Sequence, residues 1–168
     1  MVDKFLKIAS CVVVISISII FFSCKNSNKP DGLFEELNGS DTGIDFENKV
    51  SNTEEFNIFN YRNFYNGGGV SIGDINNDGL PDIYFTANMG DNKLYLNKGN
   101  WKFEDITAKA GVAEPTKWST GVVMVDINGD GLLDMYVCNA GYQKFVNKQG
   151  NSLYINNGDL TFTESAAK

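Results

Sequence analysis

The chain has 168 residues, of which 42% are hydrophobic and 21% charged, with a formal net charge of −7 and no histidine. The acidic balance argues against nucleic acid and anionic lipid surfaces as partners, because both carry negative charge. The lack of histidine removes the commonest general base. No serine stands in a nucleophile-elbow pattern, and the acidic pairs Glu35-Glu36 and Glu54-Glu55 are typical of a solvated surface. We therefore expect a chain that is not an enzyme.

The first 23 residues are predicted to be a targeting segment. Two lysines precede an apolar run at residues 8–22, which is shorter than the roughly 20 residues that span a membrane comfortably. The run ends at Ser23-Cys24, and a polar stretch follows. This arrangement resembles a bacterial lipoprotein signal, which implies removal of residues 1–23, a lipid on Cys24 and a flexible tether over residues 24–32. An ordinary secretory signal or a short anchor helix is the alternative.

Removal of this segment changes the charge and the cysteine content. It takes away two lysines and one aspartate, which leaves 12 basic and 20 acidic residues and a net charge of −8. Cys11 leaves with the signal and Cys24 carries lipid, so Cys138 has no partner for a disulfide in residues 24–168. We expect Cys138 to be a small hydrophobic core residue in a strand.

The residues that follow predict short strands separated by turns. Residues 33–66 form an N-terminal strand and loop segment, and β-branched and aromatic runs then predict strands over 69–73, 82–87, 93–97 and 101–106. The run Gly67-Gly68-Gly69 lacks the lysine and the helix of a phosphate-binding loop. It favours a close approach between backbones where the first strand begins.

The most informative motif is D-x-N-x-D-G-x-x-D, which occurs at residues 74–82 and again at 126–134. Calcium is a hard cation that takes six to eight oxygen ligands, and such a loop can curl its oxygens around one point. Glycine at the sixth position predicts a sharp turn with a positive φ. The sequence thus predicts two Ca²⁺ sites, formed by the side chains of Asp74, Asn76, Asp78 and Asp82 with the Leu80 carbonyl, and by those of Asp126, Asn128, Asp130 and Asp134 with the Leu132 carbonyl.

An EF-hand and a plain hairpin turn are the two other structures that such a loop can form. An EF-hand needs a glutamate at position 12 and flanking helices, but position 12 is Phe85 in one copy and Val137 in the other. The flanks also predict strands. The remaining alternative is a plain hairpin turn, which Asp-Gly and Asn-rich segments often form. A turn alone does not need the aspartate at position 9, so its recurrence favours a metal.

The two loops belong to a longer internal repeat. The copies are 52 residues apart at the loops and 59 apart at the later match of residues 92–97 with 151–156. An insertion of seven residues therefore lies near residues 141–150, in an expected surface loop. Four antiparallel strands in each unit of about 45–60 residues are typical of a β-propeller blade. We predict an all-β fold, a partial β-propeller of about two four-stranded blades.

Both units resemble the FG-GAP/VCBS repeat, the calcium-loop blade of integrin-α-type propellers. Residues 42–48 and 61–69 resemble the N-terminal part of VCBS-repeat lipoproteins of the ASPIC/UnbV-associated type. The resemblance implies a first blade at residues 67–113 and a second, incomplete blade at 114–168. Because propellers close with about four to eight blades, we predict that the chain is a fragment and that the remaining blades of the same protein are among its partners.

The expected function follows from this organisation. We expect an exported, lipid-anchored, calcium-binding module for binding, adhesion or scaffolding at the bacterial envelope, on the periplasmic or cell-surface face of the outer membrane. Its ligand would be a protein or a glycan, with Trp118 as the candidate ligand-facing aromatic residue. The alternatives are a fragment of a calcium-dependent enzyme acting on polysaccharides and an accessory subunit of an outer-membrane nutrient uptake system, which rests on family analogy.

Overall fold

The structure is a computed structural model that describes residues 32–140 and 150–166. The predicted signal peptide, Cys24, nearly all of the tether and most of the predicted insertion lie outside the described residues. Contacts divide the chain into residues 1–36 and a larger unit, Leu37–Lys168, which holds all the strands. Within the described residues, no helix has the length and apolar character needed to cross a membrane.

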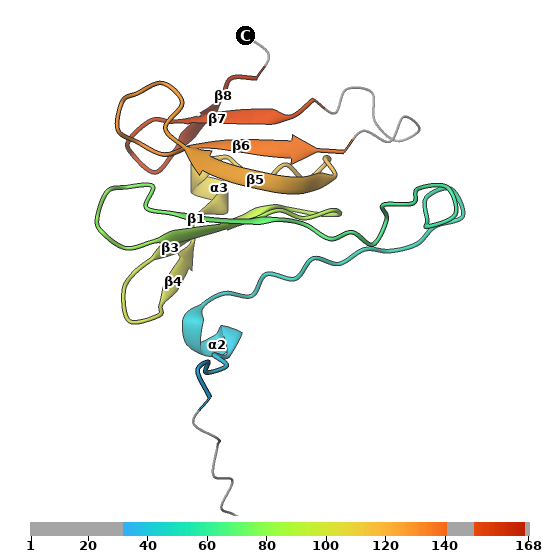
Figure 1. Cartoon of the computed structure of the whole chain (residues 1–168), viewed down its shortest axis with the longest axis horizontal. Helices are drawn as coiled ribbons and strands as arrows, with labels where there is room; N and C mark the ends of the chain where they lie inside the picture. The colour runs from blue at the N-terminus through green and yellow to red at the C-terminus, as the bar shows by residue number, and fades with distance from the viewer. Residues whose placement is uncertain (1–31, 141–149, 167–168) are drawn as a thin grey trace, which may run out of the picture. The chain divides into compact units, whose positions relative to one another are not determined.

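The larger unit contains two antiparallel sheets of four strands each, in which neighbours in sequence are neighbours in space (Figure 1). Two one-turn helices accompany them: α2 (Gly39–Thr42) precedes the first sheet, and α3 (Thr107–Ala110) lies between the two sheets in sequence. This architecture confirms the predicted all-β, partial propeller fold. The first sheet consists of β1 (Val70–Gly73), β2 (Asp82–Phe85), β3 (Lys93–Asn97) and β4 (Phe103–Asp105), and the second of β5 (Ser119–Val125), β6 (Asp134–Asn139), β7 (Ser152–Asn156) and β8 (Phe162–Glu164).

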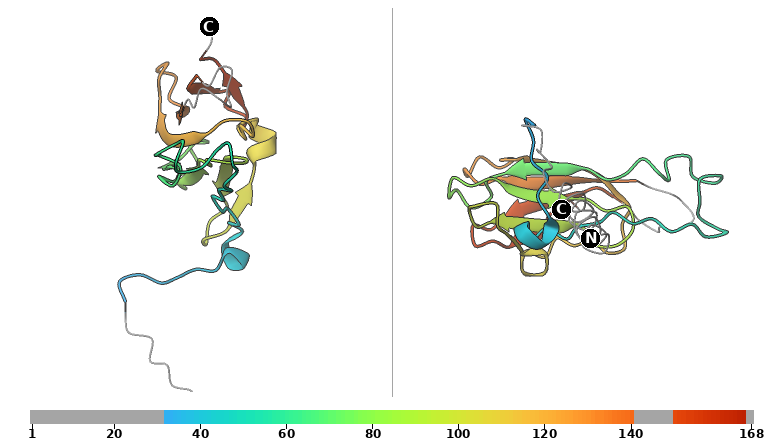
Figure 2. Two further views of the ribbon diagram at one scale, coloured as in Figure 1. Left: turned by 90° about the vertical axis from the view of Figure 1, so that its right-hand side faces the viewer. Right: turned by 90° about the horizontal axis from the view of Figure 1, so that it is seen from below.

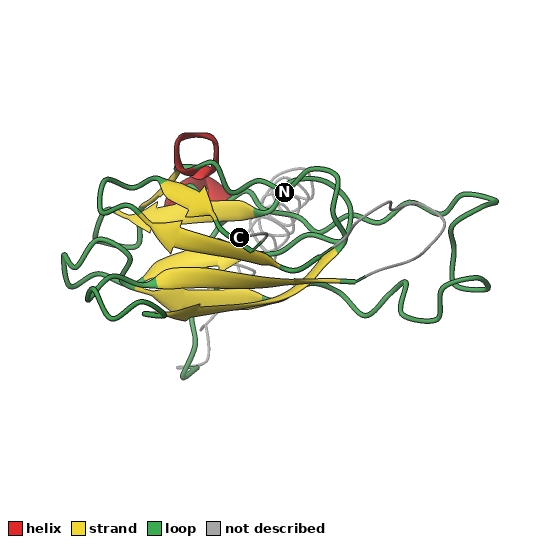
Figure 3. Ribbon diagram, turned by 90° about the horizontal axis from the view of Figure 1, so that it is seen from above, coloured by secondary structure: helices red, strands yellow, loops and turns green. Residues whose placement is uncertain are grey.

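The two sheets pack face to face around one core (Figure 3). Residues directly opposite each other in an antiparallel pair share a face, so Tyr84 with Leu94 marks one side of the first sheet, and Met135 with Tyr154 one side of the second. These sides meet in the core, where Tyr84, Leu94 and Met135 are fully buried. The approach is close at Gly73, where a Cβ would lie 2.7 Å from Leu133 Cδ1.

The other side of the first sheet is covered by the chain that precedes it. The Phe46 ring stacks on the Phe85 ring with centroids 4.9 Å apart and planes 12° apart. The Tyr95 hydroxyl donates a hydrogen bond of 2.8 Å to Asp45. This cover is partial, because Val70 and Ile72 on β1 are 53% and 65% exposed on the same side. On the outer side of the second sheet, Val123 and Val125 on β5 are 49% and 41% exposed. Both outer sides are therefore open along their first strands, and the preceding chain covers the first sheet over β2 and β3.

Residues 50–66 extend from the end of the sheets opposite the aspartate loops (Figure 2) and fold into a small aromatic cluster. The cluster buries Phe56 and Phe64 against Trp118, and the Phe56 and Trp118 rings meet edge to face at 5.0 Å. Trp118 is only 6% exposed. The expectation that it faces a ligand is therefore wrong, because the preceding segment supplies partners that its own neighbours in sequence do not.

The environment of Cys138 also differs from the expectation. It is a free, exposed thiol rather than a core residue. Side chains alternate between the two sides of β6, and its neighbour Val137 is fully buried in the contact with the first sheet. Cys138 therefore falls on the open outer side.

The triple glycine at the start of β1 confirms the prediction of a close backbone approach. A Cβ on Gly68 would lie 2.0 Å from the carbonyl oxygen of Thr86. A Cβ on Gly69 would lie 2.9 Å from the Cα of Gly121, which begins the repeated stretch of the second unit. L side chains cannot be accommodated at such distances. Glycine is therefore required at Gly68 for the approach to the end of β2 and at Gly69 for the approach of the two sheets.

Candidate metal loops

The two aspartate motifs lie side by side at the same end of the stacked sheets (Figure 1). The first loop, residues 74–82, joins β1 to β2, and the second loop, residues 126–134, joins β5 to β6. The side-chain amide of Asn77 donates a hydrogen bond of 3.1 Å to the carbonyl of Gly131, which links the loops directly. The fold thus brings two motifs 52 residues apart in sequence into contact.

The first aspartate of each motif is turned into its own loop. Asp74 accepts hydrogen bonds from the backbone amides of Asp78 (3.1 Å) and Gly79 (2.8 Å). Asp126 likewise accepts from three amides of the second loop, including that of Gly131 at 2.9 Å. The glycines at position 6, Gly79 and Gly131, have φ of +85° and +86°, which confirms the predicted positive φ.

The third, fifth and seventh positions also contact one another. Asn76 donates to Asp78 Oδ2 at 2.9 Å, and Asn128 donates to Asp130 Oδ2 at 2.8 Å. The backbone amides at the seventh position close each loop through the fifth-position carboxylate, which accepts from Leu80 and from Leu132 at 2.8 Å each. The first three ligand positions and the seventh residue are therefore held together in each loop by hydrogen bonds.

The ninth aspartate has a second, structural role. Asp82 is fully buried and accepts one backbone hydrogen bond on each oxygen, from Ile75 at 3.0 Å and from Asn97 at 2.8 Å. Asp134 makes the same pair of bonds, with Ile127 and Asn156. Each ninth aspartate therefore joins the start of its loop to the end of the third strand of its sheet.

Charge is concentrated at the first loop. Burial raises the pKa of Asp82, its two backbone hydrogen bonds lower it, and the nearby carboxylates of Asp78 and Asp74 raise it, so that the pKa lies above its usual value. The three carboxylates of the loop are thus close enough to repel one another. A cation among them would relieve this repulsion.

The donor set of the loops is compatible with a hard divalent cation. Every predicted ligand is an oxygen, and a carboxylate oxygen that accepts one N–H keeps a second lone pair, as on Asp82 and Asp134. Among the described residues, however, no three acidic or cysteine side chains converge as a preformed metal cluster. The loops are hydrogen-bonded turns whose composition suits calcium.

A buried carboxylate that the sequence did not reveal lies at the seam between the sheets. The Glu114 side chain is 2% exposed and accepts hydrogen bonds from five donors. The donors are Asn92 Nδ2 (3.3 Å), Ser119 Oγ (3.2 Å), Lys117 Nζ (2.9 Å), Tyr154 Oη (3.0 Å) and Ser152 Oγ. Burial, and then the charge of Glu114, raises the pKa of Tyr154 above its ordinary value, which keeps its hydroxyl a donor. No spacing rule predicts this network, because its donors come from both sheets and from the linker between them.

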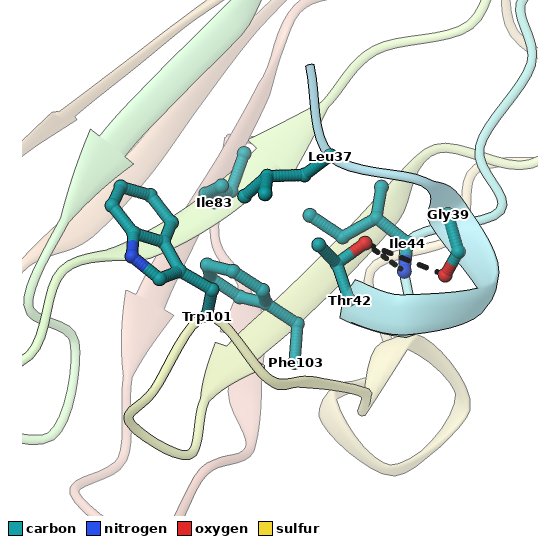
Figure 4. Close-up of a pocket in the computed structure, with 7 residues that line it drawn as sticks. All are labelled: Leu37, Gly39, Thr42, Ile44, Ile83, Trp101 and Phe103. Carbon is teal, nitrogen blue, oxygen red and sulfur yellow. Dashed lines mark hydrogen bonds between the residues drawn. The ribbon is translucent and has the colours of Figure 1, made fainter. Parts of the chain in front are cut away.

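An apolar hollow of about 280 Å³ lies on the covered side of the first sheet (Figure 4). Trp101 stands at its rim, 70% exposed and with a left-handed φ of +59°. The Thr42 hydroxyl in the hollow is already bonded to the backbone at Ile44 and Gly39. The hollow therefore offers apolar contact without a charged group. Its lining consists of Leu37, Gly39, Thr42, Ile44, Ile83, Trp101 and Phe103.

Comparison with known proteins supports a repeat of a known kind over part of the chain. Residues 74–137 match the model of the FG-GAP-like repeat. The matched stretch runs from the first aspartate of the first loop into β6, so it contains both loops, strands β2 to β4 of the first sheet and β5. The coarser part of the predicted resemblance, an FG-GAP repeat domain, is thereby supported.

Curated relatives that match part of this chain are much longer proteins. Cartilage acidic protein 1 of Mus musculus is 41% identical over 69 residues, which are 41% of this chain and 11% of that protein. The human protein is 40% identical over 72 residues (42% and 11%), and that of Xenopus tropicalis 38% over 74 residues (44% and 11%). The aligned stretch thus spans about a tenth of each relative. These matches suggest a non-catalytic repeat domain.

Proposed function

We propose that this chain is a calcium-binding FG-GAP-like repeat module that serves in binding, adhesion or scaffolding. The observation that carries the proposal is the pair of loops. Each has the same oxygen-bearing residues at the same five positions, and the two loops lie together at one end of two stacked sheets. Loops at the end of a rigid sheet pair are well placed to present a surface to a partner.

Calcium would be held in the first loop by Asp74, Asn76, Asp78, Asp82 and the Leu80 carbonyl, and in the second by the residues at the same positions. When bound, the cation supplies positive charge that offsets three carboxylates in each loop. The chain itself supplies the geometry of the loops. The buried ninth aspartates fix the loop bases, and the glycines at position 6 allow the turn.

The proposal has a cellular part that follows from the sequence. The protein would be exported and anchored through lipid on Cys24, as in ASPIC/UnbV-associated lipoproteins, and would face the periplasm or the cell surface from the outer membrane. Its partners would be a protein or glycan ligand and the remaining blades of a longer chain. Incorporation of radiolabelled palmitate in a bacterial host, with Cys24→Ala as the control, tests the anchor. Equal labelling of both proteins would rule it out.

Thermal unfolding of the full chain in calcium and in chelator tests the metal sites. A ligand that binds only the folded state stabilises it by about 2.7 kcal/mol per site at a hundredfold excess over Kd, so the midpoint should rise with calcium. In the double variant Asp74→Asn, Asp126→Asn the difference between calcium and chelator should disappear. The variant Asp91→Asn, an exposed acid outside the loops, should keep it. An unchanged midpoint in the wild type would refute calcium binding.

A further inference from the structure

A buried chain of hydrogen bonds joins the ninth aspartates of the two loops. The backbone amide of Ile75 donates to Asp82 Oδ2 at 3.0 Å, and the carbonyl of the same residue accepts from Asn156 Nδ2 at 2.8 Å. The backbone amide of Asn156 donates to Asp134 Oδ1 at 2.8 Å. Only two residues therefore separate one predicted metal ligand from the other, and all four are at most 4% exposed.

Asn156 has a counterpart in the first sheet that lacks this connection. The backbone amide of Asn97 donates a hydrogen bond to Asp82, and its side-chain amide donates one to the Pro81 carbonyl. Its side-chain oxygen accepts from the Gly99 amide at 2.9 Å. Asn156 repeats all three bonds with residues of the second sheet, and its side chain bonds in addition to Ile75 in the first loop. Within the described residues, the Asn97 bonds stay inside its own sheet. The two asparagines thus differ in the one contact that crosses between the loops.

We propose that the two loops bind divalent cations cooperatively and that Asn156 carries the coupling between them. This inference rests on the proposed function, since it assumes that the loops bind calcium. A cation in the second loop fixes Asp134, and with it the end of β7 that bears Asn156. Asn156 then holds the Ile75 peptide, whose amide orients Asp82 in the first loop. The second cation then binds to a loop that is already ordered, so its binding costs less conformational entropy of the chain.

Electrostatics opposes this coupling but is the weaker effect. The first cation makes the shared end of the molecule less negative, which reduces the attraction for a second. Of the remaining loop carboxylates, those of Asp78 and Asp130 are exposed and those of Asp74 and Asp126 half-buried, and charges in water are screened over about 8 Å at 0.15 M salt. The hydrogen-bonded path is buried and unscreened. The coupling should therefore be positive at physiological ionic strength.

Calorimetric titration of the full chain with calcium chloride in 0.15 M salt measures the coupling. The double variant Asp126→Asn, Asp130→Asn disables the second loop, and the first loop should then bind about fivefold more weakly than in the wild type, at the lower end of typical coupling. With Asn156→Ala as the starting protein, disabling the second loop should change the first-loop affinity less than twofold. With Asn97→Ala, the matched control, the fivefold effect should remain.

A second measurement does not require Asn156→Ala to fold. With the first loop disabled by Asp74→Asn and Asp78→Asn, calcium in the second loop should shift the NMR signals of the Asn156 side-chain amide and the Ile75 backbone amide. The Asn97 side-chain amide should not shift.

The outcomes of these experiments distinguish a failure of the coupling from a failure of calcium binding. No binding heat in the wild type would refute calcium binding itself, and the cooperativity with it. Two independent sites in the wild type, unshifted Asn156 and Ile75 signals, or a fivefold effect that survives Asn156→Ala would overturn the coupling alone.

Discussion

At the scale of single residues, Glu114 is one of the polar links between the sheets outside the apolar core. Its carboxylate accepts hydrogen bonds from Asn92, directly before β3, from residues of β5 and β7, and from the linker that carries it. Its backbone has a left-handed φ of +53°, uncommon for a residue with a side chain. A residue held in such a conformation indicates that the surrounding bonds determine its position.

Replacement of this residue is expected to be costly. Glu114→Ala would leave Lys117 without its counter-ion and several buried donors without an acceptor, and the loss of one partner of a buried pair costs about 3–5 kcal/mol. Urea unfolding of the wild type and the variant measures the difference in the free energy of unfolding. Glu104, whose ion pair with Lys98 is exposed with the two charges 3.7 Å apart, is the control, and Glu104→Ala should cost less than about 1 kcal/mol. Similar losses for the two variants would contradict a special role for Glu114.

At the scale of elements, the segment that precedes β1 acts as a third layer over part of the first sheet. Phe46 and Asp45 attach it to β2 and β3 through a ring stack and a hydrogen bond. The segment has no sheet partner in the described residues, so contacts of this kind hold it, together with two hydrogen bonds between Asn48 and Asn88. Its stability should therefore depend on few residues.

Phe46→Ala tests this attachment. The loss of a stacked, half-buried ring should destabilise the fold by about 1–3 kcal/mol and should expose residues 37–50 to limited proteolysis. Phe59, which is 96% exposed, provides the control, and Phe59→Ala should change neither quantity. Unaltered cleavage in Phe46→Ala would mean that the segment is held in another way.

The pairing of β3 with β4 should depend on pH through Asp105 and Lys93, whose charged groups are 2.7 Å apart. Burial alone would raise the pKa of Asp105, but hydrogen bonds from Lys93 and Thr107 outweigh it and lower the pKa. The stabilisation is therefore present above the pKa of an unfolded aspartate, about 3.9, and is lost as pH falls through the lower pKa of the folded state.

The measurement is the unfolding free energy of wild type and Asp105→Asn between pH 2 and pH 7. The wild type should be the more stable at neutral pH, and the two curves should converge at the acid end. Because both side chains are about one-third exposed, the difference should be small and should shrink with salt. A constant gap between the curves across this range would contradict the assignment.

At the scale of the whole molecule, the two sheets share one core and should unfold together. Met135 is fully buried where the second sheet meets the first. Met135→Ala should cost about 2–5 kcal/mol of the free energy of unfolding. Hydrogen exchange should show the same loss of opening free energy for the most protected amides of both sheets. Val123→Ala, on the open outer side, should cost much less. A loss of opening free energy confined to the second sheet would mean that each sheet folds independently.

How far the sequence predicts this structure depends on how local each signal is. The strands and both loop turns follow from alternation, turn residues and the glycines at position 6, which act within a few residues. Trp118, Cys138 and Glu114 escaped prediction because their surroundings come from segments far away in sequence. The buried role of Asp82 and Asp134 was also missed, since a ninth-position aspartate serves equally as a ligand and as an acceptor of backbone amides.

The order of the repeats gives the pair of sheets a direction. The side of the first sheet that carries Tyr84 packs against the second sheet, whereas its counterpart in the repeat, Tyr136, lies on the outer side of the second sheet. Stacked repeats bury their faces only against neighbours. A further sheet could therefore pack on the outer side of the second sheet in the way that the second packs on the first, over Val123. On the outer side of the first sheet it would have to displace Phe46 from its stack on Phe85.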